Sequence, residues 1–197
     1  MLDGLITELM PPTKRQEKCE GLQEKHFTEA AVMLAFADHL LNTIPGVSHV
    51  EIHPDGEHVK RFDVRKWLEN HDFKQSKTIG TTTYSGSYQR ENQTITVTSK
   101  PGIGDVVTDD GTNKIVAECK GGIINTKHPG QVSRLRRGLC EAIGLLMQRP
   151  GGERQIAVVP NTKSTLQLAQ KMIARTSLIG IEIALVDEKG NVSFVKP

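Results

Sequence analysis

Residues 104–120 read GDVVTDDGTNKIVAECK, two short apolar runs joined by a polar turn. A two-residue hairpin loop that begins with glycine favours a type II′ turn, so Gly111 is predicted to open the tip. Counting outward from this tip pairs Asp105 with Glu118 directly across the ladder. Because strand side chains alternate between faces, Lys120 shares the face of Glu118. Directly opposed side chains lie roughly 4.5–5.5 Å apart at Cβ. The sequence therefore predicts two carboxylates and an ammonium close together on one face.

Such a cluster of charges destabilises a sheet unless something compensates it. Like charges directly opposite each other are unfavourable, and aspartate is disfavoured within strands. A divalent cation would remove the penalty, because Mg²⁺ takes oxygen ligands, typically one or two carboxylates with waters and phosphate oxygens. The lysine could hold a water or stabilise developing negative charge. The alternative is a surface hairpin with a solvated salt bridge.

An aspartate followed by Glu-x-Lys on a hairpin resembles the signature of the PD-(D/E)XK (restriction-endonuclease-like) nuclease superfamily. Gly104, not proline, precedes Asp105 in this chain. The resemblance implies that Asp105 and Glu118 bind Mg²⁺, with Mn²⁺ as a substitute, and that the backbone carbonyl of Cys119 is a further ligand. It implies that Lys120 activates or orients the attacking water. The expected activity is Mg²⁺-dependent hydrolysis of DNA phosphodiester bonds by an endonuclease.

Two further catalytic candidates come from the same resemblance. Many relatives add an acidic residue from the first helix, and Glu29 is the best match. The alternative for Glu29 is an ordinary first-turn glutamate favoured by the helix dipole. Gln131 opens the helix after the Glu-x-Lys strand, where several branches carry a glutamine near the active site. Leu135 stands where branches with Gln-x-x-x-Tyr have tyrosine, and an amide at a helix start is also an ordinary feature.

Composition bounds the class of protein. The chain has 197 residues and 37% hydrophobic content, which predicts one domain with one sizeable core. No run approaches the ~18 apolar residues of a membrane-spanning helix, and no signal peptide or membrane partner is expected. Cys19, Cys119 and Cys140 lack metal-type spacing. They predict free thiols in a reducing compartment, hence a cytoplasmic location, and argue against a zinc site.

The formal net charge of +2 does not by itself indicate nucleic acid, but basic residues are grouped locally. Taken singly, each group is best interpreted as a solvated face. Arg134 and Arg137 share one face of a predicted helix, which makes phosphate contact a further interpretation. Asp109 and Asp110 are expected to be turn-forming acids beside the glycine, not metal ligands. The basic groups are Lys14-Arg15-Lys18, Lys60-Arg61-Arg65-Lys66 and Arg134-Arg136-Arg137.

Apolar periodicity and capping residues predict the remaining elements. Thr28 is the expected N-cap of a helix with an apolar stripe at helical spacing, and Asp63 is the expected N-cap of a short helix. The polar stretch 74–100 is predicted to form exposed strands or a long functional loop. Predicted helices span 28–41, 63–70, 131–148 and 161–175, and predicted strands span 48–53, 58–62, 94–98, 156–159, 181–186 and 192–195.

This order gives an α/β fold class, with a central mixed sheet flanked by helices. It resembles the restriction-endonuclease-like αβββαβ core over residues 28–186, with extra elements at the N-terminus and in 45–100. Residues 1–197 are predicted to be a single nuclease domain. Within it, 1–24 is a loosely packed arm or short helix, 45–100 an insertion or DNA-contacting region, and 101–197 the catalytic half. The expected partner is duplex or branched DNA, and cutting both strands would call for a homodimer. The alternative is a non-catalytic nucleic-acid-binding or assembly module.

Overall fold

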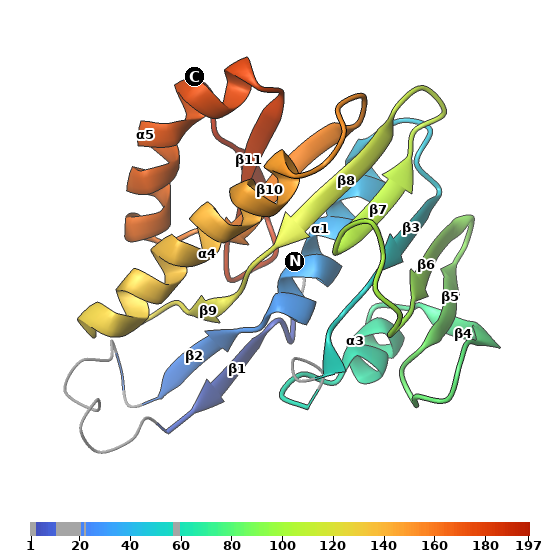
Figure 1. The fold of residues 1–197 in the computed structure, drawn as a ribbon. Helices are drawn as coiled ribbons and strands as arrows, with labels where there is room; N and C mark the ends of the chain where they lie inside the picture. Colours follow the sequence, from blue (N-terminus) through green and yellow to red (C-terminus); the bar gives the residue numbers. More distant parts are fainter. Residues whose placement is uncertain (1–2, 11–20, 22, 57–59) are drawn as a thin grey trace.

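The predicted hairpin lies at the centre of a large mixed sheet (Figure 1). In the computed structural model, which describes residues 3–10, 21, 23–56 and 60–197, β7 (Val106–Asp109) pairs antiparallel with β8 (Lys114–Cys119). The predicted register is confirmed, since Val106 lies opposite Ala117. Gly111 has φ +87°, as the first position of a type II′ turn requires. The carboxylates of Asp109 and Asp110 accept backbone hydrogen bonds from the tip, as predicted for turn-forming acids.

The predicted α/β class with a mixed sheet is confirmed. Nine strands among the described residues follow the order β12-β11-β10-β8-β7-β3-β6-β5-β4. β8 is parallel to β10, and β10 to β11, whereas β7 is antiparallel to both of its neighbours. The remaining strands are β3 (His49–Ile52), β4 (Lys74–Thr78), β5 (Gly86–Arg90), β6 (Gln93–Val97), β10 (Arg154–Pro160), β11 (Ile181–Val186) and β12 (Val192–Phe194).

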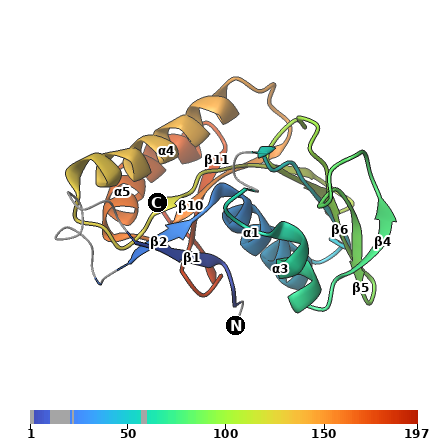
Figure 2. The same cartoon turned by 90° about the horizontal axis from the view of Figure 1, so that it is seen from below.

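The helices cover both faces of this sheet (Figure 2). α1 (Glu29–Thr43) begins where predicted, because the Thr28 hydroxyl accepts a hydrogen bond from the N–H of Ala31 at 3.2 Å. The predicted apolar stripe of this helix is buried, and most of its other residues are buried as well, so α1 is covered on nearly every side. It packs on the face of the sheet that carries Ala117 and Cys119 of β8.

The opposite face of the sheet packs against α4 (Pro129–Met147) and α5 (Lys163–Leu178). Leu135, Leu139, Ala142 and Leu146 form the predicted buried stripe of α4. Val132, expected in the same stripe, is only half-buried, because the first turn of the helix extends past the sheet and borders a cleft. α5 has a capping box at Thr162, as its N-capping residues predicted.

The N-terminal segment is not the loosely packed arm or short helix that was predicted. β1 (Ile6–Leu9) pairs with β2 (Glu24–Phe27), and β2 pairs with β9 (Gly122–Ile123), which follows directly after the Glu-x-Lys strand. Leu5 and Phe27 anchor this small sheet in the main core. The basic cluster Lys14-Arg15-Lys18 and Cys19 lie outside the described residues.

The region 45–100 contains four strands of the main sheet, β3, β4, β5 and β6. The predicted strand 58–62 was wrong for its described part, since residues 60–62 form a turn, and His58 lies outside the described residues. α3 (Val64–Asn70) is capped by Asp63 as predicted. β4, β5 and β6 form an antiparallel meander whose inward side chains, such as Tyr88 and Ile95, are buried. Of the two predicted alternatives for 74–100, the strands are therefore the ones observed, although one face of them is buried.

No helix within residues 3–10, 21, 23–56 and 60–197 is long and apolar enough to cross a membrane. Over the same ranges the two cysteines that the structure describes, Cys119 and Cys140, are free thiols.

Candidate active site

The candidate catalytic residues meet at the end of β8, between β7 and β10. Glu118 lies within β8, and Lys120 lies one residue beyond it. The N–H of Lys120 donates to the carbonyl of Val158 at 2.9 Å, so β10 fixes the backbone here. A Cβ at Gly138 of α4 would lie 3.1 Å from Cβ of Lys120, so this side chain emerges beneath α4. The alternation predicted from the sequence therefore holds at the site.

Asp105 extends the sheet with its side chain. Its backbone N–H donates to the carbonyl of Ala117 at 3.0 Å, and its Oδ2 accepts the N–H of Cys119 at 2.7 Å. Its own carbonyl accepts the N–H of His53 at 2.9 Å. The carboxylate thus takes the place of a backbone acceptor just before β7 begins. This contact holds it against the strand that carries Glu118.

Glu29 reaches the same cluster from 91 residues away. Its Oε1 lies 3.3 Å from Nζ of Lys120, and Oε1 of Glu141 lies 3.6 Å from the same nitrogen. Burial lowers the pKa of Lys120, but the carboxylates of Glu29, Asp105 and Glu141 outweigh it, so this pKa is raised. Lys120 is therefore an ammonium at neutral pH. It can orient a water by donating a hydrogen bond, but it cannot accept a proton.

Negative charge exceeds what the site compensates. Burial raises the pKa of Asp105 from 3.8 to about 7, against the hydrogen bond from Cys119, and the carboxylates of Glu118 and Glu29 raise it further. Carboxylates with raised pKa values are enriched at sites that bind cations or move protons. The thiol of Cys119 is buried in the core on the opposite face, so Cys119 contacts the cluster through its backbone alone.

Arg149 was not predicted from the sequence. Its guanidinium pairs with the carboxylate of Glu118, whose exposed fraction is 5%. Arg149 follows Gln148, the C-cap of α4, and the length of this helix carries it back to β8. Within the described part of the chain its Nε is buried without a hydrogen-bond partner. No local sequence pattern marks a residue that acts after the end of a helix.

The carboxylates of Asp105 and Glu118 are suitable ligands for a hard divalent cation, but an ion pair with Arg149 occupies Glu118. Asp105 and Glu118 supply the carboxylate oxygens that Mg²⁺ prefers. Burial first, and then the carboxylates of Glu118 and Glu29, raise the pKa of Asp105, and a bound cation would offset both effects. In the described ranges no group of three or more His, Cys, Asp or Glu side chains is arranged to hold a metal ion. The side chain of Glu118 is bound by Arg149, and that of Glu29 by Lys120. Coordination by Glu118 would therefore require its release from Arg149.

A cavity of about 380 Å³ adjoins the cluster, between the small sheet and the start of α4. Glu29 and Gln131 both line it, so these two candidates from the sequence lie around one space. Arg61 and Arg134 line it as well, whereas Arg137 does not. The predicted basic group Lys60-Arg61-Arg65-Lys66 and the group Arg134-Arg136-Arg137 thus each place one arginine at the cavity.

Glycine is required where the chain leaves the cluster. A Cβ on Gly121 would lie 2.6 Å from the backbone nitrogen of Glu29, inside any normal contact distance. The missing side chain lets the segment after Lys120 pass against the start of α1. This close approach brings Glu29 within reach of the lysine.

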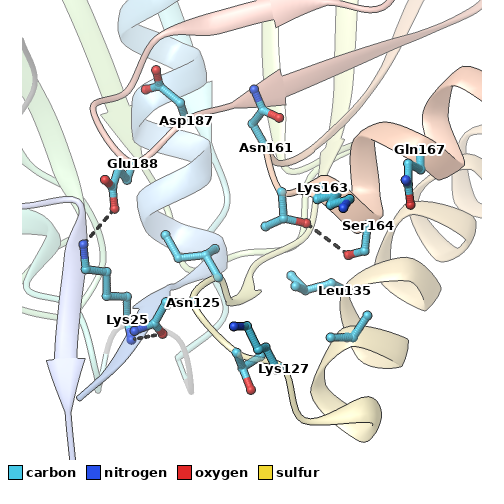
Figure 3. Close-up of a pocket in the computed structure, with 14 residues that line it drawn as sticks. Lys25, Asn125, Lys127, Leu135, Asn161, Lys163, Ser164, Gln167, Asp187 and Glu188 are labelled. Carbon is cyan, nitrogen blue, oxygen red and sulfur yellow. Dashed lines mark hydrogen bonds and ion pairs between the residues drawn. The ribbon is translucent and has the colours of Figure 1, made fainter. Parts of the chain in front are cut away.

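A larger cleft of about 840 Å³ lies beyond β2 and β9, at the start of α5 (Figure 3). Lys25, Lys127 and Lys163 line it together with Asp187 and Glu188, and Lys25 pairs with Glu188 at 3.0 Å. The lining thus carries three lysines and two carboxylates, so only a small positive excess remains here. None of the candidate catalytic side chains lines this cleft.

Comparisons of the chain with protein-family models, with curated proteins and with solved structures give no match. The interpretation of the site therefore depends on its own geometry and chemistry.

Proposed function

We propose that the chain is a Mg²⁺-dependent endonuclease that hydrolyses DNA phosphodiester bonds. The observation that carries this proposal is the convergence of Glu29, Asp105, Glu118 and Lys120, drawn from α1, the start of β7 and the end of β8. Phosphodiester hydrolysis needs neutralisation of phosphate charge, a positioned water and stabilisation of the leaving oxygen. An acidic pair beside a fixed ammonium is suited to all three needs.

The topology supports a relation to the PD-(D/E)XK superfamily. α1, β3, β7, β8, α4 and β10 occur in the order αβββαβ, with α3 and β4–β6 inserted between β3 and β7, and β9 between β8 and α4. Asp105 directly precedes β7, and Glu118 lies in β8. The meander β4–β6 extends the sheet on one side of this core, and β11 and β12 extend it on the other.

The chain's own residues have distinct parts in this proposal. Asp105 and Glu118 would hold the cation, which when bound polarises the phosphate and lowers the pKa of a coordinated water. Lys120 donates hydrogen bonds to the attacking water or to a phosphate oxygen, because its raised pKa keeps it charged. Glu29 fixes the position of that ammonium.

One observation favours the alternative of a non-catalytic nucleic-acid-binding module. The ion pair between Arg149 and Glu118 neutralises the second ligand, as expected of a site that no longer takes a cation. The intact Asp105, Glu118 and Lys120 weigh against this alternative, since no substitution has removed the chemistry.

Cleavage of supercoiled plasmid and of circular single-stranded DNA with Mg²⁺ or Mn²⁺ tests the proposal. The wild-type protein should nick at least one of these DNAs, and Glu118→Gln should reduce nicking to background because it removes a ligand charge while conserving shape. Glu141→Gln is the matched control, since Glu141 also approaches Lys120 but its side chain is 61% exposed. Nicking undiminished in Glu118→Gln would refute the proposed site. Binding of DNA without any nicking would favour the alternative.

A further inference from the structure

The cavity beside Glu29 is connected to the catalytic cluster by shared residues. Glu29 lines the cavity and contacts Lys120 at 3.3 Å. Gly121 and Gly122, which follow the lysine directly, also line it. A ligand in this cavity would therefore lie against the segment that carries the catalytic ammonium.

The side chains around the cavity suit a phosphodiester backbone. Arg61 comes from the turn before α3 and Arg134 from the second turn of α4, so guanidinium groups approach from two elements. Guanidinium forks match phosphate oxygens in charge and geometry. His26 is held by a contact of 3.1 Å between its Nε2 and the buried carboxylate of Glu24. The acidic side chain among the lining residues, Glu29, is bound to Lys120.

The size of the cavity restricts the form of nucleic acid that can enter. Its volume of about 380 Å³ is near the lower end of the roughly 300–1,000 Å³ of small-molecule pockets. A B-form duplex, whose major groove alone is about 12 Å wide, cannot enter such a space. A nucleotide-sized segment of an unpaired strand can. The walls are fixed elements, with β2 and β9 of the small sheet on one side and the start of α4 on the other.

We propose that this cavity binds the sugar-phosphate backbone of one unpaired DNA strand next to the bond to be cut. The inference rests on the proposed function, and it narrows the substrate from DNA in general to single-stranded segments such as ends, flaps or gaps. Arg61 and Arg134 bind the phosphates, and Gln131 is placed to hydrogen-bond a sugar or base. An unpaired strand requires one active site, so a single copy of the chain suffices for this reaction.

Binding measured without cleavage tests the inference. Fluorescence anisotropy in EDTA would compare a labelled 20-nucleotide single strand, a blunt duplex of the same sequence, and a 5′-mononucleotide as competitor. The single strand should bind at least ~10-fold more tightly than the duplex. Arg134→Ala and Arg61→Ala should each weaken single-strand binding roughly five- to tenfold and lower the salt slope by about 1.

Arg137→Ala is the matched control, because it removes the same charge from the same helix outside the cavity. It should change binding less than twofold. Equal effects at Arg134 and Arg137, or a preference for the duplex, would overturn the inference. Complete competition by the mononucleotide at equal concentration would identify a nucleotide pocket instead and also overturn it.

The two proposals can fail separately. If Glu118→Gln abolishes nicking but Arg134→Ala leaves single-strand binding unchanged, the cavity inference fails and the nuclease stands. If no metal supports cleavage but Arg134→Ala weakens single-strand binding, the nuclease proposal fails and the binding site stands. Circular dichroism of every variant verifies that it remains folded. The side chains of Arg61, Arg134 and Arg137 are exposed, and Glu118→Gln conserves the shape of a buried side chain.

Discussion

Replacing Asp105 with asparagine should stabilise the protein, and the gain should depend on pH. Asparagine keeps an oxygen that can accept the N–H of Cys119, the contact made at 2.7 Å by the aspartate. It removes the charge that burial and the carboxylates of Glu118 and Glu29 disfavour. The variant therefore separates the electrostatic cost of the site from its hydrogen bond.

The size of the effect follows from the raised pKa of Asp105. Between pH 3.8 and about 7 the unfolded chain has lost this proton while the folded chain keeps it. The folded state then binds more protons, so its stability falls as the pH rises through this window. The full difference corresponds to about 4 kcal/mol, and since the asparagine amide also has to be desolvated, we expect a gain of about 2–4 kcal/mol. Asp105→Asn should gain this amount at pH 8 and almost nothing at pH 4.

Urea denaturation at pH 4 and pH 8 in EDTA measures the gain, with the fluorescence of Trp67 as a probe, since it is the single tryptophan and is buried. Asp109→Asn is the control, because that exposed aspartate in the same hairpin should change stability by less than about 0.5 kcal/mol. Mn²⁺ at about 100 times its Kd should stabilise the wild type by about 2.7 kcal/mol but not Asp105→Asn. A variant no more stable than the wild type at pH 8, or one stabilised equally at both pH values, would refute the reasoning.

Three further substitutions test other contacts. Arg149→Met frees the carboxylate of Glu118 and should tighten Mn²⁺ binding about tenfold in calorimetry, a gain of about 1.4 kcal/mol; weaker binding would mean that Arg149 supports the site. Asp38→Ala removes the carboxylate that lies 2.8 Å from the guanidinium of the largely buried Arg90. It should lower the free energy of unfolding in urea by about 2–4 kcal/mol, and a loss below about 1 kcal/mol would show that solvent screens the pair. Gly121→Ala forces a Cβ against the backbone at the start of α1 and should cost about 1–3 kcal/mol and most of the nicking activity. Wild-type stability and nicking in that variant would contradict the close approach.

Local chemistry in the sequence predicted the hairpin and the helix starts. The glycine at 111 set the register, because a two-residue tip leaves one way to count outward, and the observed pairs follow it. Thr28 and Asp63 each accept a backbone hydrogen bond at a helix N-terminus, as their residue types indicated. These features depend on a few neighbouring residues, so the sequence alone could reveal them.

Apart from Glu29, which the resemblance pointed to, features that depend on distant contacts were not predicted. β1 (Ile6–Leu9) has only four residues. It pairs with β2, and β2 pairs on its other side with β9, which lies almost a hundred residues later in the chain. α1 is buried on nearly all sides because the sheet, α3 and the small sheet surround it, and its own periodicity cannot reveal this. Arg149 reaches Glu118 through the length of α4. In each case a pairing across the fold decided the outcome.

The position of β8 between β7 and β10 has a consequence for protein synthesis. Asp105, Glu118 and Lys120 leave the ribosome before α4 and β10, yet β10 holds the backbone of Lys120 and the residue after α4 binds Glu118. A parallel pair can close only after its whole crossover has been made. Nascent chains stalled before β10 are therefore expected not to bind Mn²⁺. Isolated ribosome complexes stalled at this point, titrated with a metal-responsive probe, would measure this binding. The order of the strands thus delays assembly of the proposed metal site until most of the chain has been synthesised.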